Sequence, residues 1–166
     1  LSVFTPDFKG RRPVMLWIHG GAFITGGGQE QWNNAARLAQ EDDVVTVTIN
    51  YRLGAFGYLY APELGTVNAG LQDQLAALRW VHEHIEHFGG DPENITIFGQ
   101  SAGGYSVALI LATADRAPVR RAIIQSAPLC EAYDTTQATD TAREFMGLLG
   151  KSPLKASVEE ILRAQG

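Results

Sequence analysis

The sequence predicts an α/β fold in which a mainly parallel central sheet carries helices on both faces. Three apolar, β-branched runs at residues 14–19, 44–50 and 95–98 are continuous rather than alternating, as in strands that are covered on both faces. Stretches with the helical spacing of apolar residues separate these runs. Strands that alternate with helices are joined by right-handed crossovers, and such connections give a parallel sheet.

The first part of the chain adds four elements. Residues 1–5 are typical of a strand already under way at the first residue, which suggests that the chain begins inside a longer sequence. A turn-forming stretch follows at residues 6–13. An alanine-rich helix is predicted over residues 32–40, and residues 51–67, rich in Gly, Pro and aromatic side chains, are predicted to form a long structured loop.

The remaining elements are mainly helical. Apolar residues at steps of three and four predict a helix over residues 71–88. A second helix, over residues 102–112, is almost entirely small or apolar and is expected to be buried. A strand at residues 121–125, an amphipathic helix at 142–150 and a last short helix opened by the capping box at 157–160 complete the chain.

Composition excludes several classes of function. The 166 residues suit one domain, and 45% hydrophobic with 19% charged residues is ordinary for a globular protein. No run of about eighteen apolar residues is present, so we expect no membrane span. A net charge of −5 repels phosphate backbones, which argues against a nucleic-acid partner. Cys130 is the only cysteine and excludes an internal disulfide, while the oligomeric state is left open.

The most informative motif is Gly-Gln-Ser-Ala-Gly at residues 99–103, which joins a predicted strand to a predicted helix. This is the nucleophile-elbow pattern in its required context. We expect Ser101 to adopt a strained backbone conformation, and side chains at positions 99 and 103 would collide with their surroundings. The helix that follows aims its first N–H groups at any oxyanion formed there. Without that context, a strand-to-helix turn with a serine N-cap would be the favoured interpretation of the motif.

A second loop is expected at the same edge of the sheet. His19, Gly20, Gly21 and Ala22 follow the strand at residues 14–19. In parallel sheets the reactive edge is the one where the carboxyl ends of the strands emerge. One loop that carries a nucleophile and one that exposes backbone N–H groups can build an oxyanion site together.

Four blocks of sequence resemble the type-B carboxylesterase and cholinesterase branch of the α/β-hydrolases. The blocks are residues 14–23, 50–54, 68–92 and 99–104, and they occur in the same order as in the family. The resemblance as a whole extends from Leu1 to about Ser126. The resemblance implies a partial α/β-hydrolase fold and an incomplete domain over residues 1–166. It also implies hydrolysis of a small carboxylic ester through an acyl-serine intermediate, without metal or cofactor.

The resemblance also assigns roles to single residues. Ser101 would be the nucleophile, and the N–H groups of Gly21, Ala22 and Ala102 would form the oxyanion hole. His19 and Gly20 would support that loop.

Three further residues have implications of their own. By resemblance to the family, Arg52 and Asp73 look like a structural ion pair, and this role is preferred to a catalytic one because buried charges usually persist by being paired. Gln100 stands where similar cholinesterases carry glutamate, which favours neutral esters over cationic choline esters.

The base that serine needs has no candidate after residue 101. All four histidines, His19, His82, His84 and His87, precede Ser101, whereas α/β-hydrolases follow the order Ser, Asp or Glu, His. The family's acid and histidine lie farther past the serine than residues 102–166 reach. The chain therefore resembles the N-terminal part of a longer hydrolase and is expected to be almost inactive alone. His82, His84 and His87 are expected at the far end of a four-residue strand, about 13 Å away. His19 lies at the right edge but is interpreted as orienting the loop.

The sequence offers weaker indications of a phosphate loop and a zinc site, and two other interpretations of the chain stay open. Gly26, Gly27 and Gly28 lack the Gly-Lys-Ser/Thr sequence of a phosphate loop, and residues 82–86 miss the second histidine of the zinc motif His-Glu-x-x-His. A non-catalytic binding or adhesion domain with this fold is one alternative. An inactive partial sequence that leaves the strand at 121–125 as an unpaired edge is another.

Overall fold

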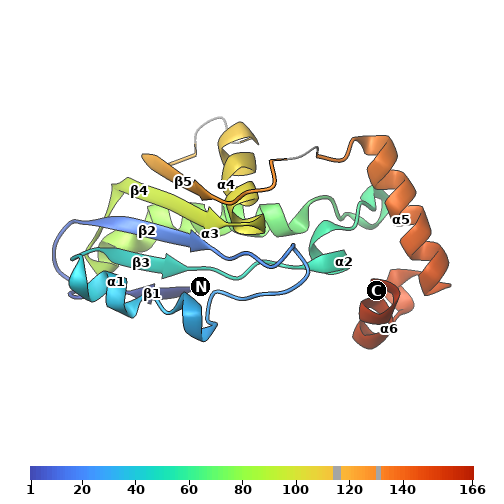
Figure 1. Ribbon diagram of the computed structural model, residues 1–166, viewed down its shortest axis with the longest axis horizontal. Coiled ribbons are helices and arrows are strands. Elements are labelled where there is room, and N and C mark those ends of the chain that lie inside the picture. The colour runs from blue at the N-terminus through green and yellow to red at the C-terminus, as the bar shows by residue number, and fades with distance from the viewer. Residues whose placement is uncertain (114–116, 130–131) are drawn as a thin grey trace. The chain divides into compact units, whose positions relative to one another are not determined.

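The computed structural model describes residues 1–113, 117–129 and 132–166 (Figure 1). The chain forms two compact units. The first unit comprises Leu1–Tyr51 and Leu71–Leu129, and the second comprises Arg52–Gly70 and Cys130–Gly166. Cys130 itself lies outside the described residues. The single incomplete α/β-hydrolase domain over residues 1–166 stays a prediction.

The first unit is built on a sheet of five strands in the order β1-β3-β2-β4-β5 (Figure 1). Leu16 in the central strand β2 is paired with Val47 of β3 on one side and Ile97 of β4 on the other, both in parallel. Only β1 runs antiparallel to its neighbour. The mainly parallel sheet is therefore confirmed. The strands are β1 (Ser2–Phe4), β2 (Arg12–Ile18), β3 (Val45–Thr48), β4 (Gly90–Gln100) and β5 (Arg121–Gln125).

Helices cover both faces of this sheet. Val14 on one face of β2 is fully buried, and a methyl group on Gly90 would lie 2.9 Å from Val14 Cγ2 and 2.7 Å from Ile85 Cγ1. This face is therefore the one covered by α3 (Ala69–His84) with the 3₁₀ turn η3 (Ile85–Phe88), and α4 (Ala102–Thr113) packs on it too. The short helix α1 (Ala36–Glu41) lies on the opposite face (Figure 1).

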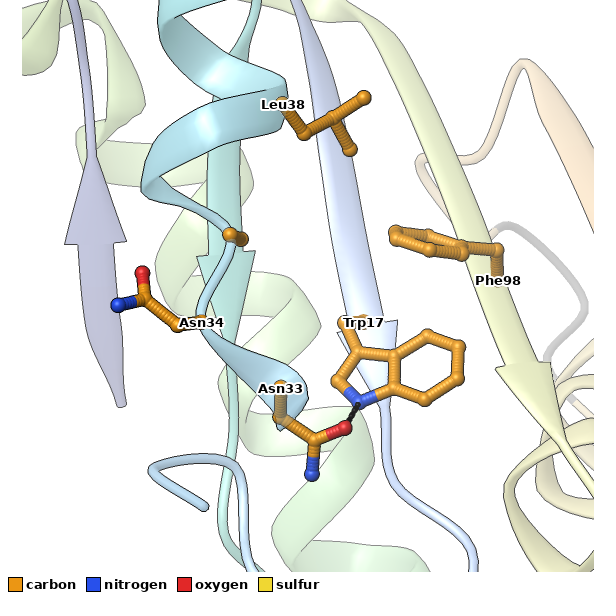
Figure 2. A pocket seen from close by; sticks show the side chains of 6 residues that line it. Trp17, Asn33, Asn34, Leu38 and Phe98 are labelled. Carbon is orange, nitrogen blue, oxygen red and sulfur yellow. Dashed lines mark hydrogen bonds between the residues drawn. The ribbon is translucent and has the colours of Figure 1, made fainter. Parts of the chain in front are cut away.

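The α1 face is covered less completely. Trp17 of β2 and Phe98 of β4 lie side by side there, with ring centroids 4.9 Å apart. Together with α1 they line a pocket of about 200 Å³, shown in Figure 2. The indole N–H of Trp17 donates to Asn33 Oδ1 at 3.1 Å and fixes the ring at the pocket wall.

The predicted helix over residues 32–40 is wrong in its first half. The structure has a 3₁₀ turn, η1 (Gln31–Asn33), and α1 begins only at Ala36. Asn34 is extended between them, and its side-chain oxygen accepts the N–H of Ala36. Asparagine competes with the helix for backbone hydrogen bonds, and here it delays the helix start.

The strand before Ser101 is longer than predicted. Gly89 ends η3 in the left-handed region at φ 75°, and its carbonyl oxygen accepts the N–H of Arg12. Pairing with β2 therefore starts at Gly90 and passes an irregularity between Arg12 and Val14. The strand β4 consequently has 11 residues, not four.

The second unit is helical. The predicted loop over residues 51–67 contains two short helices, and Gln165 Oε1 accepts the N–H of Ala55 in the first of them at 2.8 Å. Buried side chains of Phe145, Leu149 and Ile161 form a small core. The helices are α2 (Gly54–Tyr58), η2 (Pro62–Leu64), α5 (Thr135–Leu149), η4 (Pro153–Lys155) and α6 (Val158–Ala164).

Capping explains where the two longest helices of this unit begin. The capping box of Ser157 and Glu160 is confirmed. The helix α5 begins with a second capping box, between Asp134 and Gln137, which extends it a full two turns before the apolar residues that the sequence analysis used. Gly150 ends α5 in the left-handed region, a conformation that glycine adopts readily.

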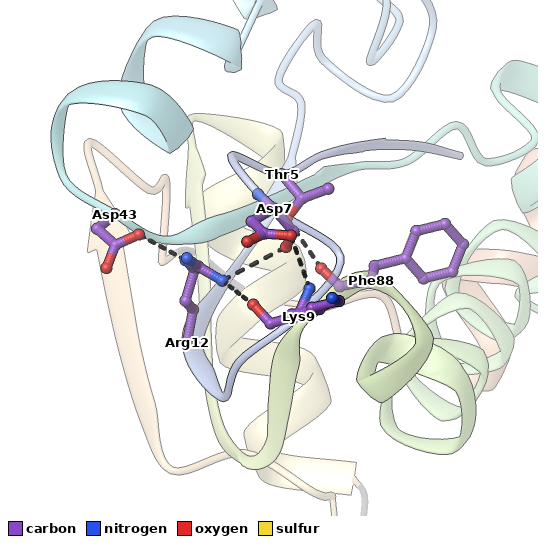
Figure 3. Close-up of polar contacts among 6 residues, drawn as sticks. All are labelled: Thr5, Asp7, Lys9, Arg12, Asp43 and Phe88. Atoms are coloured by element: carbon purple, nitrogen blue, oxygen red, sulfur yellow. Dashed lines mark hydrogen bonds and ion pairs between the residues drawn. The ribbon is translucent and has the colours of Figure 1, made fainter.

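Polar contacts hold the amino ends of the strands in the first unit (Figure 3). The guanidinium of Arg12 donates to the carbonyl oxygens of Asp7 and Lys9 and to the carboxylate of Asp43. The hydroxyl of Thr5 donates to the carbonyl oxygen of Phe88 at 2.9 Å. The turn before β2 is thereby attached to the turn before β4.

Within the part of the chain that the structure describes, no helix is long and apolar enough to cross a bilayer.

Candidate active site

Ser101 occupies a sharp turn between β4 and α4. Its φ of 56° lies in the left-handed region, which confirms the expected backbone strain. The N–H of Ser101 donates to the carbonyl oxygen of Gln125 in β5, and its own carbonyl oxygen accepts the N–H of Tyr105, both at 2.9 Å. The last contact is the first hydrogen bond of α4. The turn is thus held by a neighbouring strand on one side and by the helix on the other.

Two glycines make this turn possible. A methyl group on Gly99 would lie 2.5 Å from the carbonyl carbon and oxygen of Gly103. A methyl group on Gly103 would overlap the carbonyl oxygen of Ile18 and lie 2.8 Å from that of His19. The expected crowding at both positions is confirmed. The helix α4 can approach the end of β2 this closely only because residue 103 has no side chain.

The loop after β2 forms a single left-handed turn. Ala22 and Phe23 have φ values of 53° and 63°, and the N–H groups of Ile24 and Thr25 both donate to the carbonyl oxygen of Gly21 at 3.0 Å. In a helical turn, whether right- or left-handed, the N–H groups of the first residues have no hydrogen-bond acceptor within the turn. They point away from the turn at its N-terminal end. The N–H groups of Gly21 and Ala22 are the first in this one.

The two loops lie against each other at the carboxyl end of the sheet. A methyl group on Gly20 would lie 2.7 Å from the carbonyl oxygen of Gln100 and 3.4 Å from Cβ of Ser101. Ala102 is the first residue of α4, so its N–H also lacks an acceptor within the helix. Ser101 thus lies beside Gly20, at the start of the loop after β2, and directly before the first N–H groups of α4. N–H groups at the start of a helix can bind an anionic oxygen.

His19 is held within its own loop. It is 2% exposed, and its Nδ1 lies 2.8 Å from the carbonyl oxygen of Gly20. The ring stacks on that of Tyr51 with centroids 4.4 Å apart and an interplanar angle of 16°. The Tyr51 hydroxyl donates to the carbonyl oxygen of His19 at 2.8 Å. Burial raises the pKa of Tyr51 to about 12, so the phenol keeps its proton and stays a donor.

Sequence reasoning missed Tyr51 and placed it at the start of a loop. The available signal was its position directly after the buried run at residues 44–50, whose carboxyl end meets the same edge of the sheet as His19. An aromatic residue with a hydroxyl group at that point can reach the carbonyl oxygen of the residue that follows the neighbouring strand β2.

The other histidines lie at the opposite end of β4. Nδ1 of His82 lies 3.2 Å from the carbonyl oxygen of Pro92, near the first residue of that strand. Nine residue-to-residue steps of extended chain lead from Pro92 to Ser101, or about 30 Å. The separation is therefore greater than the sequence predicted. His84 packs on Trp80, with ring centroids 5.2 Å apart.

Two further predictions can be placed against the structure. Arg52 belongs to the second unit and Asp73 to the first, and the ion pair between them stays a prediction. Among the described residues, no group of three or more His, Cys, Asp or Glu side chains is arranged to hold a metal ion.

A second strained serine gives a natural comparison. Ser126 follows β5, is exposed and has a φ of 47°. No described helix begins at the next residue, whereas α4 begins directly after Ser101. Left-handed backbone alone therefore does not single out Ser101. The adjacent helix start and the loop at Gly20 do.

Comparison with known proteins gives concordant results. A profile described as "Carboxylesterase family" matches residues 1–165. The chain is 44% identical over 158 residues to a para-nitrobenzyl esterase of Bacillus subtilis, covering 90% of this chain and 32% of the relative. It is 45% identical to a probable N-octanoylanthranilate hydrolase of Rhodococcus erythropolis, covering 99% and 37%.

Solved structures agree. A carboxylesterase of Geobacillus stearothermophilus superposes with a TM-score of 0.92 at 39% identity, covering 98% of this chain and 38% of that one. A para-nitrobenzyl esterase gives a TM-score of 0.90 at 41% identity, covering 98% and 37%. These neighbours have the α/β-hydrolase fold, and so has this chain. The chain spans about a third of the length of the relatives it matches.

Proposed function

Because the chain belongs to the carboxylesterase family, we propose that it supplies the nucleophile and the oxyanion hole of a serine carboxylic-ester hydrolase. The observation that carries the proposal is the strained turn at Ser101 with Gly20 packed beside it. The members of the family and the solved neighbours named above are esterases or hydrolases by name.

The proposed reaction has two steps. The Ser101 hydroxyl oxygen attacks the carbonyl carbon of the ester and gives up its proton to a base. The negative charge that develops on the carbonyl oxygen is met by the N–H groups of Gly21, Ala22 and Ala102. Collapse of the tetrahedral intermediate expels the alcohol, which takes up the proton, and leaves an acyl-serine that water then hydrolyses. One such donor contributes about 2.7–4 kcal/mol to transition-state stabilisation.

We further propose that the base is supplied by residues outside the printed sequence. His19 uses Nδ1 toward Gly20 and its ring against Tyr51, which suits a supporting role in the loop. His82 lies at the opposite end of β4. The triad acid and the histidine would then come from a part of the protein that corresponds to the remainder of the relatives.

The proposed substrates are neutral carboxylic esters. Gln100 is exposed next to Ser101, and its amide oxygen lies 3.2 Å from the position of a methyl group on Gly20. A neutral amide at this place offers a cationic alcohol group no counter-charge. Esters without a charged alcohol therefore fit the site better than choline esters.

Hydrolysis of p-nitrophenyl butyrate by the protein as its gene encodes it tests the proposal. We expect Ser101→Ala to lower the rate by about a million-fold, the cost of losing the serine of a related triad. Ser126→Ala is the matched control and should leave the rate within about twofold, because Ser126 has no helix start beside it. A rate that Ser101→Ala does not change would contradict the proposal, and no measurable hydrolysis by the wild type would favour a binding or adhesion domain.

The printed 166 residues alone give a second test, of the origin of the base. We expect a preparation of these residues to hydrolyse the ester no faster than its Ser101→Ala variant. Turnover that depends on Ser101 would place a base within this chain.

A further inference from the structure

We propose that Tyr51 is a positioning residue for the oxyanion loop and that it acts through His19. The inference rests on the proposed function, because it concerns how the donors of that site are held in place. The hydroxyl and the ring of Tyr51 both contact His19, the residue before the loop.

Tyr51 holds His19 in two independent ways. Its hydroxyl donates to the carbonyl oxygen of His19 at 2.8 Å, and its ring stacks on the imidazole. Both residues are nearly inaccessible to solvent, at 6% and 2% exposure. In such surroundings water does not compete for the carbonyl oxygen, so the phenol is the group that fixes it.

His19 passes this restraint to the loop. Its Nδ1 contacts the carbonyl oxygen of Gly20, one residue before the left-handed turn. A methyl group on Gly26, after that turn, would lie 2.7 Å from the same Nδ1 and 2.5 Å from the carbonyl oxygen of Gly20. The imidazole therefore lies between Tyr51 on one side and both ends of the oxyanion loop on the other.

The carbonyl group that Tyr51 holds also faces α4. A methyl group on Gly103 would lie 2.8 Å from the carbonyl oxygen of His19 and 2.9 Å from its carbon. The neighbouring residue, Ala102, carries the third proposed donor. The His19 carbonyl is thus the point at which the loop of Gly21 and Ala22 meets the first turn of α4.

Through this contact Tyr51 would fix the position of the N–H groups of Gly21 and Ala22 relative to the N–H group of Ala102. Oxyanion donors act at 2.7–3.1 Å from the oxygen, and a misplacement of about 1 Å can cost about a hundredfold in rate. A residue that fixes the meeting point of two loops therefore changes the chemical step more than substrate binding.

The test uses Tyr51→Phe in the protein as its gene encodes it, with p-nitrophenyl butyrate as substrate. The variant keeps the stacked ring and removes only the hydroxyl. We expect kcat to fall about tenfold, less than the 10²–10³ that loss of a donor costs, with KM within about twofold. The inhibition constant of an alkyl trifluoromethyl ketone should rise by the same factor as kcat falls, because its serine adduct carries an oxyanion. Tyr133→Phe, at an exposed tyrosine, is the matched control and should change none of these values.

A second variant guards against a failure to fold. His19→Phe can still stack on Tyr51 but cannot contact the carbonyl oxygen of Gly20, so it should show the same fall in kcat at constant KM. A Tyr51→Phe enzyme with kcat within twofold of wild type would overturn the inference. Failure of both variants to fold would overturn it as well, because the pair would then hold the fold rather than the loop.

The outcome is separable from that of the proposed function. If Ser101→Ala does not change the rate of hydrolysis, the proposed function fails. If Ser101→Ala abolishes hydrolysis while Tyr51→Phe leaves it intact, the inference alone fails.

Discussion

The two ends of the sheet in the first unit are held by different kinds of contact. At the amino ends, long charged side chains make the connections, with Arg12 reaching Asp43 and Arg11 reaching Asp91 at 3.0 Å. At the carboxyl ends backbone atoms meet directly, as where the N–H of Ser101 donates to Gln125, and the uncharged side chain of Tyr51 adds a hydrogen bond to His19. Glycines there let the chain segments approach each other without intervening side chains.

The difference matters for what each end can tolerate. A charged side chain near the surface can be replaced, because water takes over its partners and exposed ion pairs contribute little. A backbone contact across a glycine cannot be replaced, because any side chain must displace a strand or a helix. The end of the sheet that carries Ser101 should therefore tolerate fewer substitutions than the opposite end.

The largest effect is expected from Gly103→Ala. The added methyl group would overlap the carbonyl oxygen of Ile18, so α4 or β2 must move. We expect the free energy of unfolding to fall by about 3 kcal/mol, measured by urea denaturation of the protein as its gene encodes it.

Gly147→Ala is the matched control for that substitution. Gly147 lies inside α5 and has no atom within 4 Å of an added methyl group. Its substitution should raise the free energy of unfolding by about 0.5–1 kcal/mol, because alanine suits a helix better than glycine. Equal effects at positions 103 and 147 would contradict the crowding described at the carboxyl end.

A smaller loss is expected from Arg12→Ala at the amino end. Its side chain is 19% exposed and donates to two carbonyl oxygens besides Asp43. We expect the free energy of unfolding to fall by about 1–2 kcal/mol, while the rate of ester hydrolysis per folded molecule stays unchanged.

The control for this prediction is Arg37→Ala. Arg37 pairs with Glu41 on the surface of α1 and is 83% exposed, so its loss should change the free energy of unfolding by less than about 0.5 kcal/mol. A loss of activity in Arg12→Ala that exceeds its loss of folded protein would show that the amino end also shapes the site.

The smallest effect concerns the pH dependence at Asp91. Its burial would raise the pKa of this carboxyl group, but the hydrogen bond and charge of Arg11, with the N–H of Glu93, outweigh that effect and hold the pKa below its ordinary value of 3.8. A depressed pKa stabilises the folded state at a pH above the ordinary value, and this stabilisation disappears as the pH falls through the folded value.

Asp91→Asn keeps an oxygen acceptor for Glu93 and removes only the charge. Melting temperatures of wild type and variant should differ at pH 6 and converge below pH 3.8. A difference that stays constant down to pH 3 would show that the charge of Asp91 contributes nothing.

The sequence predicted the parts of the fold that local patterns determine. The continuous apolar runs became β2, β3 and β4, and the turn at Ser101 followed from the glycines on either side of it. Boundaries set by single polar side chains were harder to predict. Asn34 delayed α1, and the capping box at Asp134 lengthened α5.

The part of the site that sequence reasoning could not supply depends on contacts between distant segments. Tyr51 and His19 are 32 residues apart, and no local pattern indicates that a tyrosine hydroxyl meets a histidine carbonyl group. The left-handed turn at Ala22 and Phe23 was likewise hidden, because non-glycine residues with positive φ are set by their tertiary surroundings.

The central claim is that the Ser101 hydroxyl is the activated nucleophile of this chain. It is tested most directly by treating the protein as its gene encodes it with a fluorophosphonate probe and locating the adduct by peptide mass spectrometry. We predict a single adduct on Ser101 and none on Ser126, which shares the left-handed backbone but lacks the helix start. Absence of an adduct on Ser101, or equal labelling of both serines, would contradict the account.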